Sequence, residues 1–141
     1  MSSKKGIEMA ELHIIRGLPG SGKSTFAKTL DIPFIEADQY FTDFNGRYIY
    51  DPNKVKDAHA WCQKRVKEYL SRNESVAVAN VFTKLWQIEI YLDMAKRFNA
   101  KAYIHECKGK FQNIHDVPED AIAKMEFEWE NIPSWYQHLV K

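Results

Sequence analysis

The chain has 141 residues and a formal net charge of +1 at pH 7, and hydrophobic residues make up 45% of it. This length fits one domain with a single core, and the near-neutral charge argues against a broad nucleic-acid-binding surface. Two cysteines are too few for a disulfide framework, and their spacing suggests no metal site. Residues 1–11 lack the apolar core of a signal peptide, and no apolar run approaches the roughly 18 residues that span a bilayer. We therefore expect a soluble, cytoplasmic protein.

The first predicted elements enclose a glycine-rich segment. Residues 12–15 form an apolar run of strand character, residues 17–24 read GLPGSGKS, and residues 24–30 have the composition of a helix. The segment fits the pattern GxxxxGK[ST], and this phosphate-binding loop requires a strand before it and a helix after it. Its glycines let backbone N–H groups approach phosphate oxygens, which the N-terminus of the helix also attracts. The sequence therefore predicts a nucleoside triphosphate site.

The residues of this loop have distinct predicted roles. The Lys23 ammonium can reach the β- and γ-phosphates of ATP, and the Ser24 hydroxyl is a candidate ligand for Mg²⁺. The predicted nucleotide contacts are Gly20, Ser21, Gly22, Lys23, Ser24 and Thr25.

Strands and helices alternate along the rest of the chain. We expect strands at residues 33–37, 76–79 and 102–105, helices at 52–70, 85–98 and 118–130, and an aromatic tail at 131–141. Asn45-Gly46 is a strong turn signal, so residues 41–51 are expected to form a loop or small hairpin. Asp51 is the expected N-cap of the helix that Pro52 opens. This alternation predicts a parallel sheet covered on both faces, in one domain over residues 1–141 with a flexible tail at 1–10.

Candidate catalytic groups follow the predicted strands. Asp38 lies just beyond the second strand, where the carboxyl ends of parallel strands gather a site. A carboxylate there can accept a proton from an attacking hydroxyl or hold Mg²⁺, so Asp38 is a candidate for both roles, with a helix N-cap as the alternative. The third strand lacks the carboxylate with which many phosphate-loop enzymes hold Mg²⁺, because Asn80 and Thr83 carry no charge.

Phosphoryl transfer also needs a cation that reaches the transferring group. Lys108 and Lys110 flank Gly109 after the fourth strand, and they are candidates for this catalytic role, with a solvated basic turn as the alternative. His59 falls on the apolar face of its helix and is expected to be a core histidine. The aromatic residues near the C-terminus are expected to pack there rather than stack on a base; they are Trp129, Trp135 and Tyr136.

Several segments between residues 12 and 130 form a more specific set than the first motif alone. They are RGLPGSGKS at 16–24, ADQYF at 37–41, YDP at 50–52, AHAWC at 58–62, NVFT at 80–83 and NIHDVP at 113–118. In this order they resemble the small P-loop kinases of the polynucleotide-kinase-like group, which includes short phage and bacterial AAA-family ATPases. The resemblance implies a three-layer α/β P-loop NTPase sandwich, with a four- to five-stranded parallel sheet and the phosphate-loop strand in its interior. It also implies that Lys23 and Ser24 bind ATP and Mg²⁺ and that Asp38 is the general base.

Two departures from this group concern catalysis. Larger relatives carry Asp-Asn-Thr-Asn where this chain has ANVF at residues 79–82, so an acidic residue is missing. They also have an Arg-bearing lid helix before an Asn-x-His-Gly-Val-Pro segment, whereas this lid is short, its nearest side chain is Gln112, and Asp116 replaces the glycine. Lys108 or Lys110 is the candidate replacement for the lid arginine.

These observations leave three functions open. The first is an ATP-dependent kinase whose acceptor is a hydroxyl on a nucleic-acid end or a nucleotide-like molecule. The second is the same transfer to a small metabolite or nucleotide sugar. The third is an ATP-binding regulatory protein that engages a protein partner. The missing acidic residue and lid arginine favour the third, and Asp38 favours the two kinase hypotheses.

Overall fold

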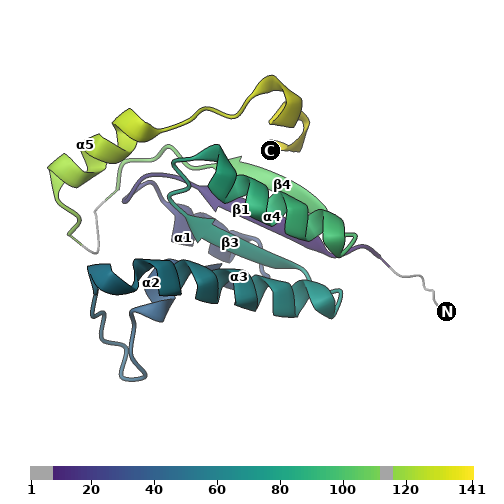
Figure 1. Ribbon diagram of the computed structural model, residues 1–141, viewed down its shortest axis with the longest axis horizontal. Helices are drawn as coiled ribbons and strands as arrows, with labels where there is room; N and C mark the ends of the chain where they lie inside the picture. The colour runs from purple at the N-terminus through teal and green to yellow at the C-terminus, as the bar shows by residue number, and fades with distance from the viewer. Residues whose placement is uncertain (1–7, 112–115) are drawn as a thin grey trace.

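The computed structural model describes residues 8–111 and 116–141. Its centre is a parallel sheet of four strands in the order β2-β3-β1-β4 (Figure 1). The strands are β1 (Glu11–Arg16), β2 (Phe34–Glu36), β3 (Val76–Asn80) and β4 (Lys101–Glu106). The predicted sheet is therefore confirmed, and β1, which leads into the phosphate-loop segment, lies in its interior.

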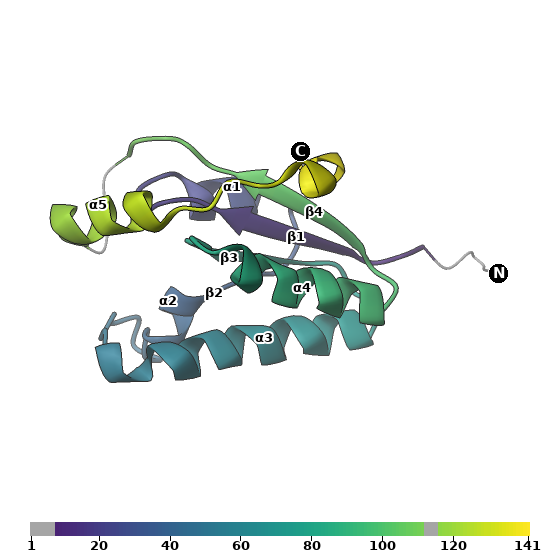
Figure 2. The ribbon, with the colours of Figure 1, turned by 45° about the horizontal axis from the view of Figure 1, so that its top comes forward.

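Helices cover the two faces of the sheet, as the alternation of elements predicts (Figures 1 and 2). The long helices α3 (Val55–Ser71) and α4 (Leu85–Arg97) pack on one face, and α1 (Lys23–Thr29) packs on the other. A further helix, α5 (Glu119–Glu128), follows the loop after β4. Within residues 8–111 and 116–141, no helix has the length and apolar character needed to cross a membrane.

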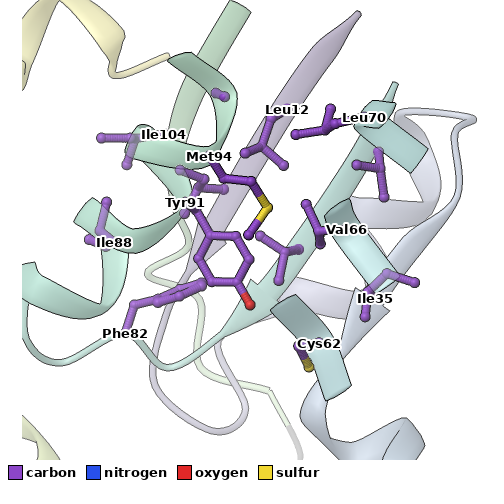
Figure 3. Packing of buried hydrophobic residues seen from close by; sticks show 14 of the residues in the cluster. Leu12, Ile35, Cys62, Val66, Leu70, Phe82, Ile88, Tyr91, Met94 and Ile104 are labelled. Atoms are coloured by element: carbon purple, nitrogen blue, oxygen red, sulfur yellow. The ribbon is translucent and has the colours of Figure 1, made fainter. Parts of the chain in front are cut away.

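The larger part of the core lies between the sheet and the helices α3 and α4. Their buried side chains repeat at helical spacing and meet the apolar residues of β1, β3 and β4 (Figure 3). Val66 of α3, Ile88 of α4 and Val78 of the central strand β3 are each at most 1% exposed. A smaller cluster on the opposite face joins Ala27 of α1 to three buried strand residues, which are Ile15, Ala77 and Ala79.

The segment after β2 differs from the prediction. The strand ends at Glu36 rather than at residue 37, and Ala37–Tyr40 form a short helix, α2, so that Asp38 lies in a helical turn. The N–H of Ala37 donates to Asn80 Oδ1 at 3.0 Å, which ends the strand by holding the backbone at the start of this turn. Propensity alone does not foresee this, because the bond comes from a different strand.

The predicted hairpin after α2 is confirmed. Thr42 and Tyr48 form an antiparallel bridge, and Gly46 has a φ of 82° in the turn between them. Asp51 is a cap, as expected: its carboxylate accepts from the N–H of Asn53 at 2.9 Å. It caps a 3-10 turn (Pro52–Lys54) that precedes α3.

The C-terminal segment, predicted as an aromatic tail, follows the edge of the sheet at β4. Residues Ser134–Leu139 form a 3-10 helix, and Val140 makes a parallel bridge with Ile104 of β4. The Tyr136 hydroxyl donates to Glu89 Oε2 at 2.8 Å, which ties this segment to α4. Tyr136 therefore packs at the chain end, as predicted, whereas Trp135 is 67% exposed.

Candidate nucleotide-binding site

The glycine-rich segment connects β1 to α1 at the carboxyl end of the sheet. Gly20 and Gly22 have φ angles of 81° and 94°, in the left-handed region that residues with a Cβ avoid. Lys23 Nζ donates to the carbonyl oxygens of Gly17 at 2.8 Å and Leu18 at 3.1 Å. The lysine ammonium therefore lies within the loop, where it can exchange these carbonyls for phosphate oxygens.

Burial and two nearby carboxylates shift the pKa of Lys23 in opposite directions. Desolvation lowers the pKa of its ammonium, while the carboxylates of Glu36 and Asp38 raise it in part. Both carboxylates therefore act on the lysine that the loop pattern assigns to ATP. The structure brings together three of the predicted site residues here, which are Lys23, Ser24 and Asp38.

Glu36 is a site residue that the sequence analysis missed. The Ser24 hydroxyl donates to Glu36 Oε2 at 2.9 Å, which joins the first turn of α1 to the last residue of β2. The sequence analysis placed Glu36 inside a strand over residues 33–37. One signal in the sequence could have identified it: Glu36 lies near the carboxyl end of a predicted parallel strand, where the side chains of a site gather.

Asp38 lies in α2, next to the hairpin of residues 41–50, which we call the aromatic hairpin because it carries Phe41, Phe44, Tyr48 and Tyr50. The hydroxyl of Tyr48 donates to Asp38 Oδ1 at 3.2 Å. Desolvation, followed by the charge of Asp38, raises the pKa of Tyr48 to about 12, so this phenol stays a donor at neutral pH. The ring of Tyr48 stacks 6.5 Å from that of Tyr50, and both contact Phe41. The carboxylate is thus held at one edge of an aromatic cluster.

The loop after β4 lies against the glycine-rich segment. The N–H of Gly109 donates to the carbonyl of Ser21 at 3.2 Å, and the N–H of Phe111 donates to that of Gly20 at 2.7 Å. A Cβ at Gly109 would lie 2.9 Å from the Ser21 carbonyl oxygen, so this approach requires a glycine. The two segments enclose a pocket of about 330 Å³, which is lined by Ser21, Gly22, Thr25, Phe26, Cys107, Gly109 and Phe111.

The candidate lid residues lie on this same loop. Lys108 and Lys110 flank Gly109 and are both exposed. Their catalytic role stays a prediction. Gln112, which the sequence analysis named beside the short lid, and His115 of the NIHDVP segment lie outside the described residues.

Arg16, the residue before the glycine-rich segment, is fully buried. Its guanidinium donates to Glu106 Oε2 at 3.0 Å and to the Phe82 carbonyl at 2.6 Å, and it lies 3.7 Å from the ring centroid of Trp129. Burial lowers the pKa of Arg16, and Glu106 opposes that shift. Trp129 packs as predicted, and its partner is a residue that the sequence analysis gave no role.

Three other residues that the sequence analysis considered lie elsewhere in the fold. His59 is only half-buried on α3, so the expected core position is not confirmed, and burial lowers its pKa. Asn80 holds the start of α2 through its carbonyl oxygen. Thr83 accepts from the N–H of Glu130 at 2.8 Å through its backbone carbonyl, which joins the segment after β3 to the segment after α5.

The arrangement fits Mg²⁺ and a triphosphate. Lys23 offers an ammonium inside a loop whose glycines leave the backbone accessible, and Ser24 and Glu36 offer adjacent oxygen ligands. Within the two described ranges, no three His, Cys, Asp or Glu side chains form a metal cluster. Magnesium does not need one, because it is commonly held by one or two carboxylates together with substrate phosphates and water.

Known proteins resemble this chain in sequence and in fold. The family model described as "AAA domain" matches residues 12–125. NEDD4-binding protein 2 of Homo sapiens is 33% identical in an alignment of length 129 that covers 81% of this chain and 7% of that protein. The chain thus spans a small part of this relative.

Two solved structures have the same fold at lower identity. The Pnkp1/Rnl/Hen1 RNA repair complex aligns with a TM-score of 0.59 and 20% identity, over 94% of this chain and 43% of that one. A gluconokinase from Sinorhizobium meliloti 1021 aligns with a TM-score of 0.61 and 17% identity, over 95% and 82% of the two chains. These likenesses confirm the predicted kinase-like P-loop fold.

Proposed function

We propose that this chain, which belongs to the AAA domain family, binds Mg²⁺·ATP and transfers its γ-phosphoryl group to a hydroxyl of an acceptor. One observation carries the proposal: Lys23 Nζ lies within the glycine-rich loop, where it donates to the carbonyls of Gly17 and Leu18, and Asp38 directly follows β2 at the same end of the sheet. A phosphate-binding cation and a candidate base therefore share one end of the sheet. A γ-phosphoryl transferase needs this combination.

The proposed reaction uses the described residues in separate roles. Lys23 leaves the loop carbonyls and binds phosphate oxygens, which holds the γ-phosphorus in place. The acceptor oxygen forms a bond to that phosphorus, the bond to the β–γ bridging oxygen breaks, and ADP leaves. Asp38 takes the proton of the acceptor hydroxyl, while Tyr48 orients its carboxylate through the 3.2 Å hydrogen bond.

The preferred acceptor is a nucleic-acid end or a nucleotide-like molecule. The aromatic hairpin supports this choice, because planar bases stack on aromatic rings whatever their sequence. Phe44 at its tip is 98% exposed, and Tyr50 is 55% exposed. The similarity to a protein of an RNA repair complex agrees with it. The similarity to a gluconokinase keeps a small metabolite as the second candidate.

The test is incubation with γ-labelled ATP and a panel of acceptors. The panel contains DNA, RNA and nucleosides with 5′-hydroxyl groups, together with gluconate. We expect label in the 5′-hydroxyl compounds, and Asp38→Asn should reduce the rate by about 10²–10⁴ while ATP binding persists. Transfer to gluconate alone would favour the metabolite hypothesis. ATP binding without transfer to any acceptor would favour an ATP-binding regulatory protein.

A further inference from the structure

The bond between Ser24 and Glu36 bears on how this site holds its metal. The serine of a phosphate loop commonly binds Mg²⁺ together with an Asp at the end of a neighbouring strand. Here the Ser24 hydroxyl lies 2.9 Å from Glu36 Oε2, at the end of β2. A serine hydroxyl and a carboxylate in contact are hard oxygen donors of the kind that Mg²⁺ prefers.

The strand register explains why this carboxylate comes from β2. Glu36 pairs with Ala79 of β3, and paired residues of adjacent parallel strands place their side chains on the same face. Ala79 packs against α1, the helix that carries Ser24. The carboxylate that β3 lacks is thus present one strand away, on the same face of the sheet.

The neighbouring polar groups have other contacts. Asn80 accepts from the N–H of Ala37 through Oδ1 at 3.0 Å, so its oxygen holds the backbone of α2. Asp38 lies within α2 and accepts from Tyr48. Among these groups, Glu36 is the carboxylate that the structure brings to Ser24.

We propose that Glu36 is the carboxylate that serves the bound Mg²⁺ in this site, in place of an Asp at the end of β3. Together with Ser24, it orients the ligands of the metal. Asp38 then acts as the base toward the acceptor. This inference rests on the proposed function, because it requires that the loop bind Mg²⁺·ATP. It divides between two carboxylates the two roles that the sequence analysis gave to Asp38.

The proposal can be tested because the interaction between Glu36 and the triphosphate changes sign when a metal ion is present. A carboxylate beside a triphosphate repels it when no metal is present and favours it when a divalent cation lies between them. The parent protein should therefore bind ATP more tightly with excess Mg²⁺ than with EDTA. Glu36→Gln should reduce this ratio by roughly tenfold to hundredfold, the usual effect of removing a group that orients a metal's ligands. It should also bind metal-free ATP more tightly than the parent does.

The measurement is calorimetric titration of ATP in both solutions, which needs no acceptor. Gln has the shape of Glu and can still accept from Ser24, so the fold should persist, and a thermal melt without nucleotide checks this. Asp38→Asn is the matched control, because it removes a neighbouring carboxylate that also acts on Lys23. It should change the ratio by less than Glu36→Gln does. An unchanged ratio in Glu36→Gln would overturn the proposal, and so would a ratio lost only in Asp38→Asn.

A second pair of variants gives a positive signal. A thiolate prefers Cd²⁺ to Mg²⁺, so Glu36→Cys should bind ATP more tightly with Cd²⁺ than with Mg²⁺, and Asp38→Cys should not. The reverse pattern would assign the metal to Asp38. If the parent binds no ATP in any of these solutions, the proposed function itself fails. That outcome is distinct from a parent with a clear Mg²⁺ dependence that Glu36→Gln leaves intact.

Discussion

Lys23 illustrates how a single residue can be held ready for a ligand. Its side chain is half-buried, and its ammonium donates to the two carbonyls of Gly17 and Leu18. A phosphate would replace neutral acceptors with charged ones, and charged hydrogen bonds are roughly twice as strong as neutral ones. The side chain thus gains from nucleotide binding.

We predict that Lys23→Ala weakens ATP binding by about 2–4 kcal/mol, which is the scale for truncating one partner of a buried charge pair. Calorimetry measures this directly. Lys28→Ala is the matched control, because Lys28 is exposed in the same helix and should leave the affinity unchanged. Undiminished ATP affinity in a folded Lys23→Ala protein would contradict the phosphate-loop assignment.

A second residue-scale prediction concerns His105, on the face of the sheet that α1 covers. Its Nε2 lies 2.8 Å from His13 Nδ1, and Glu11 contacts the other ring nitrogen of His13. Burial, then His13 and Lys141, lower the pKa of His105 to about 4. Between pH 6.5 and 4 the unfolded chain therefore binds a proton at this residue that the folded chain does not bind.

The free energy of unfolding should consequently fall as the pH is lowered through this window. His105→Gln should flatten that part of the profile, because its side chain does not titrate. Urea unfolding of both proteins at several pH values between 4 and 7 measures the slopes. Parallel profiles for the parent and the variant would show that other groups cause the loss of stability.

At the scale of elements, the loop after β4 and the glycine-rich segment form one unit. Two backbone hydrogen bonds join them, from Gly109 to Ser21 and from Phe111 to Gly20. These bonds place Lys108 and Lys110 on a segment that is attached to the phosphate loop.

We predict that Lys108→Ala/Lys110→Ala abolishes phosphoryl transfer while ATP still binds. The physical reason is that charge on the phosphoryl oxygens is stabilised mainly in the transition state. Labelled transfer and calorimetry on the same samples separate the two effects. Lys64→Ala/Lys67→Ala, on the exposed side of α3, removes the same charge and should transfer at the parent rate. If the first variant also transfers at that rate, the two lysines belong to a solvated turn.

How far each element could be predicted depended on where its contacts lie. The loop at residues 17–24 and the helix α3 were predictable, because a local motif and a helical repeat encode them. The end of β2 was not, since an Asn80 side chain from another strand determines it. The pairing of Ser24 with Glu36 was equally hidden. It depends on the register that places Glu36 beside Ala79, and no local pattern fixes that register.

At the scale of the whole molecule, Arg16 connects the phosphate-loop end of the sheet to the C-terminal segment. It contacts Glu106 of β4, the Phe82 carbonyl after β3, and the ring of Trp129. Leaving such a cation buried without its partners is costly. The segment after α5 therefore helps to stabilise the ends of the strands that carry the site.

We predict that Trp129→Ala lowers the free energy of unfolding by about 2–4 kcal/mol, through lost burial and a lost cation–π contact. Chemical denaturation measures the change. Trp135→Ala is the matched control: this tryptophan is 67% exposed, so its loss should change stability by about 0.5 kcal/mol or less. Equal effects of the two substitutions would contradict the structural role assigned to Trp129.

The contact between Arg16 and Trp129 also has a consequence for protein synthesis. Residues 17–24 leave the ribosome more than 100 residues before Trp129, the tryptophan that covers the preceding arginine. Domains generally fold as units during translation. A nascent chain arrested before residue 129 should therefore hold ATP less firmly than a chain that extends past it, so that nucleotide capture follows the synthesis of Trp129 rather than that of the loop.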